Sequence, residues 1–411
     1  MNTNAALAKH GLARLAQQDH FRTPQRLTPF HPRLAALMTG ADWYDWAGYA
    51  APSKIRDEEL EYFAIRSTAA LFDISPMVKY RIEGPGAVDF LNRLTLRDVR
   101  KLGLRRVHYT AWCDDEGQLL DDGTLFRLSE NLFRLCCQER HLPWLLDTAD
   151  GFEVAIVEET EDIAALALQG PTSAAILREA GFAISSMKPF DIAPFPHENG
   201  EVLVSRTGFT GDLGYELFAD RAKALSLWDR LWEAGRLRGI AAIGYSALNR
   251  ARIEAGFIVA NADFVTSEKA LRADRTRYPD ETGLDWMVDM AKPHFNGKRA
   301  IATARAKGKM RHALVGIELE GNEPASMALL YHRKTREAGI ITAATWSPTT
   351  KRNIAIASIE RKYADGANAE LWAEIYALRE LRYHKMMVRA RIVERPFLKL
   401  ARRTATPPAD F

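Results

Sequence analysis

The chain has 411 residues, of which 47% are apolar and 27% charged, and its formal net charge is +3. This length predicts two or three packed subdomains rather than one core, and the nearly balanced charge argues against a nucleic-acid partner. The three cysteines and ten histidines form no disulfide framework and no metal-ligand spacing, and no apolar run approaches the roughly 20 residues that span a bilayer. We therefore expect a cytoplasmic protein with no metal and no membrane partner.

The first half of the chain begins with two recognisable helical patterns. Residues 1–26 are poor in acids and rich in small and basic side chains, which predicts a helical extension rather than a cleaved transit peptide. Residues 78–99 read as a strand, a Gly-Pro-Gly turn and an amphipathic helix that carries Val88, Leu91 and Leu94 on one face.

The second half contains one more strong helix and then changes character. Residues 221–235 place Leu225, Trp228 and Trp232 at helical spacing and stop at Gly235, so we expect these tryptophans in a core. From 308 to 400 short β-rich runs alternate with polar turns, which predicts a separate β domain. Residues 401–411 are predicted to be a frayed tail.

The stretch RTGFTGDLGYELFAD, residues 206–220, poses a choice between a phosphate loop and a turn. Its glycines follow the spacing GxxGxxG, and neither the dinucleotide pattern GxGxxG nor a final Gly-Lys-Ser/Thr is present. A turn followed by a strand would put Tyr215 and Glu216 on opposite faces. The Glu216 carboxylate can then accept two parallel N–H bonds from a flat donor such as a pterin or guanine edge, or it is a solvated strand residue.

Seven segments, taken together, are similar to the aminomethyltransferase family, the folate-binding T-protein of the glycine cleavage system. They are LFDISPMVKYRIEGPGAVDFLNRLT, ALQGPTS, RTGFTGDLGYELF, RARIEAG, ETGLDWMV, FNGKRAI and GIITAATWSPT. Their order and spacing resemble the family from about residue 27 to about 399. The resemblance implies an α+β fold of several subdomains, with a folate-binding body over 27–293 and a C-terminal β-barrel over 308–400. It also implies tetrahydrofolate as cofactor.

The resemblance implies site residues as well. In the family the acid of the GYE segment holds the pterin, which makes Glu216 the first cofactor residue here. The acid of a segment resembling DEGQLLDDGTLFRL is catalytic, and Asp122, with its neighbour Asp121, matches it. Arg252 is a candidate for the carboxylates of the folate tail, or it pairs with Glu254 or another acid. The remaining cofactor candidates are Tyr215, Gln138, Met77 and Trp286.

Several positions depart from the family pattern. Pro76 replaces the histidine of a Ser-His-Met segment, Gln138 stands where an asparagine is usual, and the stretch after it is several residues shorter. Asn249 stands where an aspartate is usual. These departures favour the demethylase branch of the family, in which a methyl group moves to tetrahydrofolate from a small methylated donor, a sulfonium, methylated amine or methoxyarene.

Two alternatives stay open. Aminomethyl transfer from a lipoyl carrier protein would be favoured if the basic run over 382–403 docks an acidic carrier, although that run also reads as an ordinary edge strand. A non-catalytic folate-binding protein is the weaker alternative, because the Lys-Gly-Cys motif of such relatives is absent.

The demethylase hypothesis needs a donor site. Residues 42–52 carry Trp43, Trp46 and Tyr49, which can form an aromatic box for a methylated cation, or can be core residues. His108 and Tyr109, just before the aspartates, can supply a proton to a leaving oxygen, unless His108 is a satisfied histidine of a strand.

Overall fold

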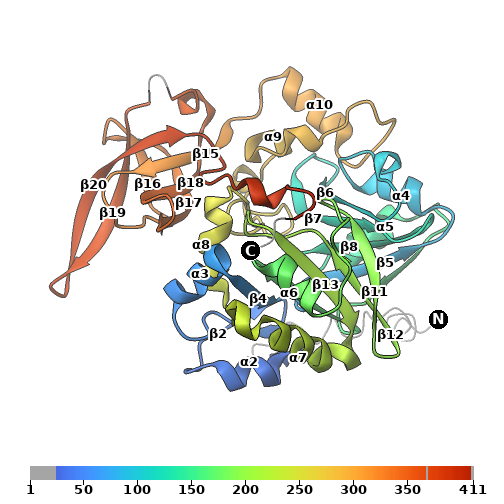
Figure 1. The fold of residues 1–411 in the computed structure, drawn as a ribbon. Coiled ribbons are helices and arrows are strands. Elements are labelled where there is room, and N and C mark those ends of the chain that lie inside the picture. The colour runs from blue at the N-terminus through green and yellow to red at the C-terminus, as the bar shows by residue number, and fades with distance from the viewer. Residues whose placement is uncertain (1–24, 367–368, 409–411) are drawn as a thin grey trace.

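The computed structural model describes residues 25–366 and 369–408 (Figure 1). Of the helical extension predicted over 1–26, residues 1–24 lie outside these ranges. The predicted fold class is confirmed, since helices and three β-sheets precede a closed β-barrel. No helix in the described ranges has both the length and the apolar character needed to cross a membrane.

A six-stranded sheet forms the centre of the body. Its order is β11 (Ile192–His197), β12 (Gly200–Ser205), β13 (Gly214–Asp220), β10 (Ile163–Gln169), β4 (Ala69–Asp73) and β14 (Ile240–Ala242). Alternate side chains of a strand point to opposite faces, so this sheet serves two cores. One face packs on α6 (Ser173–Glu179) and α7 (Ala224–Gly235), and the other on α3 (Glu58–Ser67) and α8 (Tyr245–Glu254).

The predicted helix over 221–235 is α7, and it ends at Gly235 as expected. Trp228 is buried in the core and stacks on Trp232 at a centroid distance of 5.6 Å. The prediction that these rings belong to a core is therefore confirmed.

A second, five-stranded sheet stands beside the first. Its order is β6 (Arg106–Cys113), β7 (Leu119–Arg127), β8 (Leu132–Cys137), β5 (Val78–Glu83) and β9 (Ala155–Glu158). The helices α4 (Ala87–Leu94) and α5 (Leu142–Thr148) cover it. The predicted strand, turn and helix over 78–99 is confirmed as β5 and α4, in which Leu91 and Leu94 are fully buried and Val88 is half-buried.

The two sheets meet through an aromatic contact. The ring of Phe126 on β7 packs edge-on against Phe218 on β13, with centroids 5.3 Å apart. Both rings are buried in the same core. The seam between the sheets is thus closed at this level by hydrophobic packing.

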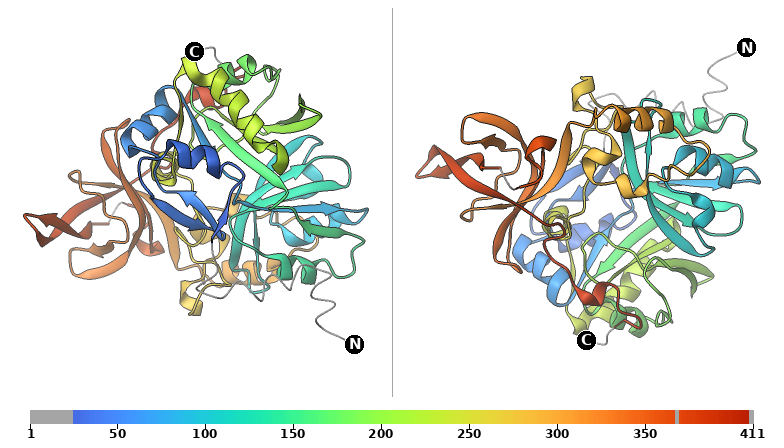
Figure 2. Two further views of the ribbon diagram at one scale, coloured as in Figure 1. Left: turned by 90° about the horizontal axis from the view of Figure 1, so that it is seen from below. Right: turned by 90° about the horizontal axis from the view of Figure 1, so that it is seen from above.

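Smaller elements complete the body. A three-stranded sheet consists of β1 (Arg26–Leu27), β3 (Tyr49–Pro52) and β2 (Trp43–Trp46), beside α2 (His31–Leu37). After α8 the chain forms a long irregular segment that contains α9 (Pro279–Thr282), the 3-10 turn η6 (Asp285–Met287) and α10 (Lys298–Ala306). Figure 2 shows this segment lying between the second sheet and the barrel.

The C-terminal barrel is closed by six antiparallel strands. Their order is β15 (His312–Leu319), β18 (Arg352–Glu360), β17 (Arg336–Ser347), β16 (Leu329–His332), β19 (Leu371–Arg379) and β20 (Arg382–Val393). β20 pairs with β19 along its length and with β15 over residues 390–393. The expectation of an ordinary edge strand is therefore wrong at residues 390–393, where closure of the barrel gives β20 a second neighbour, whereas residues 382–389 pair with β19 alone.

The chain returns to the body after the barrel, where the 3-10 turn η8 (Ala401–Arg403) crosses the RTGFTGD turn. Arg402 donates to both carboxylate oxygens of Asp212, at 2.6 and 2.8 Å. The buried Arg206 donates to the carbonyl of Ala405 and the hydroxyl of Thr406. The prediction of a frayed tail is wrong for residues 401–408, because these contacts hold the backbone against the body. We call this segment the C-terminal strap.

Candidate active site

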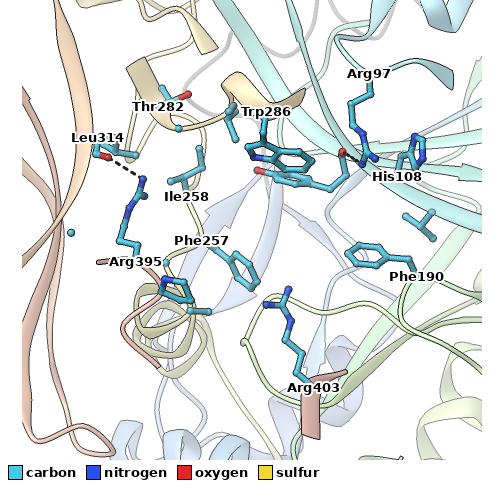
Figure 3. Close-up of a pocket in the computed structure, with 18 of the residues that line it drawn as sticks. Arg97, His108, Phe190, Phe257, Ile258, Thr282, Trp286, Leu314, Arg395 and Arg403 are labelled. Atoms are coloured by element: carbon cyan, nitrogen blue, oxygen red, sulfur yellow. Dashed lines mark hydrogen bonds between the residues drawn. The ribbon is translucent and has the colours of Figure 1, made fainter. Parts of the chain in front are cut away.

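A cavity of about 860 Å³ lies where the second sheet, the barrel, the irregular segment and the C-terminal strap come together (Figure 3). β6 contributes Tyr109 and His108 to its wall, and the loop after α8 contributes Phe257. Trp286 on η6 projects into the middle of the view in Figure 3. Its ring lies 6.4 Å from that of Tyr109.

The rim of this cavity carries three arginines, Arg97, Arg395 and Arg403. Arg97 donates to the carbonyl of Tyr109 at 3.0 Å and lies over the Trp286 ring, and Arg395 donates to the carbonyl of Leu314 at 3.0 Å. Arg403, on the strap, lies 5.0 Å above the centroid of Phe257. Within residues 25–366 and 369–408, none of the three forms an ion pair with a carboxylate. Guanidinium groups that lack an internal anion at one cavity favour an anionic ligand with carboxylate groups.

Tyr109, which lines the cavity, contacts an acid that lies outside the lining, Asp122. The Tyr109 hydroxyl on β6 donates to Oδ2 of Asp122 on β7 at 2.7 Å. Burial, followed by the charge of Asp121, raises the pKa of Asp122 to about 7, against the hydrogen bond from Tyr109. Asp122 therefore exchanges a proton close to neutral pH, which is what a general acid requires. The sequence-predicted residues Tyr109, Asp122 and Asp121 are thus brought together.

Asp121 lies behind this acid and is fully buried. Its carboxylate accepts hydrogen bonds from the backbone N–H groups of Asp122 and Glu139, at 2.8 and 3.1 Å. His141 Nε2 contacts the same carboxylate at 3.0 Å. Sequence reasoning missed His141, and the only signal available was its place three residues after Gln138, inside the shortened stretch.

The side chains of Glu216 and Tyr215 point to opposite faces of β13, as those of adjacent strand residues do. Glu216 shares a face of β13 with Phe218, toward the seam between the sheets, and accepts from the Thr207 hydroxyl at 2.6 Å. Burial raises the pKa of this carboxyl. Tyr215 points the other way into the core under α7 and is fully buried. The assignment of Tyr215 to the cofactor is corrected, since it cannot touch a ligand that Glu216 faces.

Arg252 is held internally and lies away from the rim. Its guanidinium forms an ion pair with Asp263 and also donates to Asn249 Oδ1 at 2.9 Å. Only 2% of the residue is exposed. The assignment to the folate tail is therefore corrected, and the alternative of an internal acid partner is confirmed, with Asp263 rather than Glu254 as that acid. Arg252 fixes the loop that carries Phe257, whose carbonyl it also contacts.

The remaining cofactor candidates fall into two groups. Trp286 is 60% exposed and lines the cavity. Met77 and Gln138 are half-buried, and neither belongs to the cavity wall. Met77 packs against the core that contains Phe72, and its carbonyl accepts from Lys79 Nζ at 2.7 Å.

His108 lines the cavity but is unsuited to the predicted acid role. Burial, followed by the positive charges of Arg97 and Arg106, lowers its pKa to about 4. The imidazole is therefore neutral at pH 7 and has no proton to give. The correction leaves Tyr109, which lines the cavity, and its partner Asp122 as the proton-bearing pair.

The predicted aromatic box is absent from the described residues. Trp43 stacks near His31 and packs on the core under α7, whereas Trp46 stacks on Phe72 in the opposite core, at 6.0 Å. Tyr49 is buried, 2% exposed, beside Arg26. Positions 43 and 46 lie on opposite faces of β2, which separates the rings. The substrate role given to these three residues is corrected to core packing.

Comparisons with known proteins agree with this architecture. Residues 30–292 match the model of the GCVT N-terminal domain, and residues 312–399 match that of the glycine cleavage T-protein C-terminal barrel domain. A protein of Bacillus pumilus named aminomethyltransferase is 31% identical over 370 residues, 88% of this chain and 96% of its own length. The aminomethyltransferase of Halothermothrix orenii is 31% identical over 77% of this chain and 87% of its own length.

A solved structure extends the likeness to the whole fold. The glycine cleavage system aminomethyltransferase T of Bartonella henselae superposes with a TM-score of 0.80, covering 91% of this chain and 98% of that one at 24% sequence identity. At this identity the likeness concerns the fold alone.

Proposed function

The chain belongs to the aminomethyltransferase family, a family of tetrahydrofolate-dependent one-carbon transferases, and from this premise we propose that it moves a one-carbon unit from an aminomethylated lipoyl carrier protein to tetrahydrofolate.

The prediction of a demethylase for a small methylated metabolite is wrong. Relatives that are 31–33% identical over 77–88% of the chain are named aminomethyltransferase. The departures at Pro76, Gln138 and Asn249 therefore do not mark a change of reaction. The packing of Trp43 and Trp46 into opposite cores, where they cannot form a box for a methylated cation, agrees with this correction.

The cavity suits a reduced folate. A folate joins a flat pterin to a flexible tail that ends in carboxylates, so it needs an acceptor for ring N–H groups at one end and cations at the other. Glu216 does not line the cavity, and we propose that it supplies the acceptor from the seam between the two sheets, in a buried setting where a charge-assisted pair is strong. Arg403, Arg395 and Arg97 supply the cations. We assign the pterin to Glu216 and the tail carboxylates to these arginines.

The proposed reaction needs no oxidant. The C–S and C–N bonds of the donor break, and two C–N bonds form at two N–H groups of tetrahydrofolate. The carrier leaves as a thiol and the amine as ammonia, and the two protons released from the folate nitrogens balance the two that these products gain. The carbon stays at the same oxidation level. Tetrahydrofolate supplies the nitrogen atoms that take up the carbon. The chain has to hold donor and acceptor in contact and to place a proton on the leaving nitrogen.

Asp122 is our candidate for that proton. Its carboxyl is protonated up to about neutral pH, and Tyr109 fixes one carboxyl oxygen and so orients the other. The observation that carries the proposal is this pair, of which Tyr109 lines a cavity whose rim bears three arginines that form no ion pair with a carboxylate of the described residues. A solvent-exposed acid would be ionised and could not serve as the donor.

The test is a stoichiometric assay with the full chain. Purified protein, tetrahydrofolate and an aminomethylated lipoyl carrier protein are mixed, and methylenetetrahydrofolate and ammonia are measured together. The proposal expects one molecule of each per turnover. Absence of both products, with a carrier that is active toward a known aminomethyltransferase, contradicts it.

A further inference from the structure

A chain of charged side chains runs from solvent to the back of Asp122. Glu268, whose side chain is 61% exposed, lies 3.2 Å from Nδ1 of His141 through its Oε2. His141 is 2% exposed, and its Nε2 reaches Oδ2 of the fully buried Asp121 at 3.0 Å. Asp121 is the residue next to Asp122 and accepts a hydrogen bond from its backbone N–H. This series of contacts links Asp121 on β7, His141 after β8 and Glu268 in the irregular segment after α8.

The backbone around His141 fixes its orientation. The N–H of His141 donates to the Tyr80 hydroxyl on β5 at 2.8 Å. The Trp112 ring of β6 stands edge-on to the imidazole, with centroids 5.7 Å apart and planes at 85°. An imidazole held in this way presents one nitrogen to Asp121 and the other to Glu268.

The charges in this region favour a protonated imidazole. Burial alone would lower the pKa of His141, but the hydrogen bond to Asp121 and the carboxylate of Glu268 raise it to about 9. Lys269 forms an ion pair with Glu139 rather than with a group beside the imidazole, with its Nζ 2.6 Å from Glu139 Oε1. His141 therefore carries a positive charge between two carboxylates at neutral pH.

The groups that face Asp121 and Asp122 come from four elements. They are His141, Tyr109 on β6, Cys137 on β8 and Asp263 in the loop after α8. Asp263 is neutralised by Arg252, and the burial of Cys137 raises the pKa of its thiol well above the usual value, which keeps it uncharged. His141 is thus the cation that directly contacts Asp121.

We propose that His141 and Glu268 are positioning residues for Asp122: the charge of His141 keeps Asp121 ionised, and the anion of Asp121 in turn keeps the proton on Asp122. The catalytic meaning of this inference rests on the function proposed above, whereas the electrostatic linkage belongs to the protein without ligand.

The sign of the linkage follows from Coulomb's law. Removing the charge of His141 makes the buried Asp121 carboxylate less stable, so Asp121 is protonated more of the time. Asp122 then faces a neutral neighbour and ionises at a lower pH than before. Because the two carboxyls are adjacent and buried, their titrations belong to the pair, and a shift of roughly one unit or more is expected for the step seen at Asp122.

The experiment follows the carboxyl groups by NMR in the ligand-free full chain. The protein is labelled with ¹³C at aspartate carboxyls, and the signal of Asp122 is assigned as the one lost in Asp122→Asn. We expect its midpoint near pH 7 in the unmodified chain and at a clearly lower pH in His141→Asn. The same fall should appear in the pH dependence of kcat, with little change in KM for folate.

Two further variants keep the test decisive. Glu268→Gln acts on an exposed side chain and removes one carboxylate from the imidazole, so a smaller shift in the same direction is expected even if His141→Asn folds poorly. His197→Asn is the matched control, since His197 is 4% exposed on β11 and bonds to Ser226. It should leave the midpoint of Asp122 unchanged.

The outcomes separate this inference from the proposed function. An Asp122 midpoint that is the same in the unmodified chain, His141→Asn and Glu268→Gln would overturn the linkage, even for an enzyme that releases ammonia from the carrier. A shifted midpoint in a protein that fails the carrier assay would establish the linkage and refute the proposed function.

Discussion

Two antiparallel strand pairs of this chain look alike in sequence and differ in use. The β2–β3 pair carries Trp43, Trp46 and Tyr49 among acids, and the β6–β7 pair carries Tyr109 and Asp122. In the first pair Trp43 and Trp46 pack into opposite cores, and Tyr49 lies beside Arg26. In the second, Tyr109 lines the cavity and holds the acid. A cluster of chemically able side chains becomes a site only where its strand borders a cavity and no helix layer covers it.

The largest effect is expected at the acid of the β6–β7 pair. Asp122→Asn keeps the shape and the Tyr109 contact but cannot give a proton, so kcat should fall by roughly 10²-fold or more while folate binding is retained. Asp115→Asn, in the exposed turn before β7, is the matched control and should keep full turnover. Steady-state kinetics and folate titration measure both. Full activity of Asp122→Asn would remove this acid from the mechanism.

A smaller effect is expected at the rim. Arg403→Ala should weaken binding of tetrahydrofolate about tenfold, since a charged hydrogen bond contributes roughly 1.5 kcal/mol or more. Calorimetric titration measures the change. Arg336→Ala on the exposed start of β17 should change nothing. An analogue without the glutamate tail should bind both proteins equally, and an undiminished effect of Arg403→Ala on that analogue would argue that the arginine does not contact the tail.

Two tryptophan variants test whether a ring of the β2–β3 pair serves stability and a ring of the cavity serves binding. Trp46→Ala removes a half-buried ring stacked on Phe72, so it should lower the free energy of unfolding by roughly 1–3 kcal/mol and leave kcat/KM of the folded protein unchanged. Trp286→Ala removes an exposed cavity ring and should weaken folate binding with little loss of stability. Denaturant unfolding measures the free energy of unfolding of each variant, and binding titrations measure its affinity for folate. Loss of folate affinity in Trp46→Ala alone would reverse the assignment of the two regions.

The smallest effect concerns stability as a function of pH. The pKa of Asp122 rises from 3.8 to about 7 on folding, so the folded state holds more protons than the unfolded state between those values. Stability therefore falls as pH rises from about 4 to about 7, and the loss is complete above that range. The Asp122→Asn variant has no carboxyl to ionise at this position, so it does not lose stability as pH rises. Its Tm should therefore exceed that of the unmodified chain at pH 8 by a few degrees. Calorimetry at pH 8 and pH 4.5 tests it, and an equal difference at both values would contradict the linkage.

Local patterns allowed part of this structure to be predicted. The helix with Leu91 and Leu94 inward, the end of α7 at Gly235 and the opposite directions of Tyr215 and Glu216 all follow from periodicity and turn chemistry. The overall resemblance gave the fold and the folate cofactor. These features depend on neighbours in sequence or on a motif set that spans the chain.

Other features depend on contacts between distant segments. His141 meets Glu268 only because the second sheet packs on the irregular segment after α8, and it meets Asp121 because β7 and β8 pair within that sheet. Arg252 pairs with Asp263 although its own helix carries Glu254, and Glu254 is taken by Arg66. Arg403 reaches the cavity because the strap is fastened through Arg402 to Asp212. Spacing in the sequence contains no signal for such pairings, and the pKa of His108 likewise depends on charges brought together by folding.

The most direct test of the account is a crystal structure of the full chain with 5-formyltetrahydrofolate, a stable reduced folate. The account predicts the ligand in the cavity between Trp286 and Phe257, with its pterin at the Glu216 carboxylate and its tail carboxylates within hydrogen-bond distance of Arg403 or Arg395. A folate bound outside this cavity, or one whose pterin lies at the rim arginines, would contradict it.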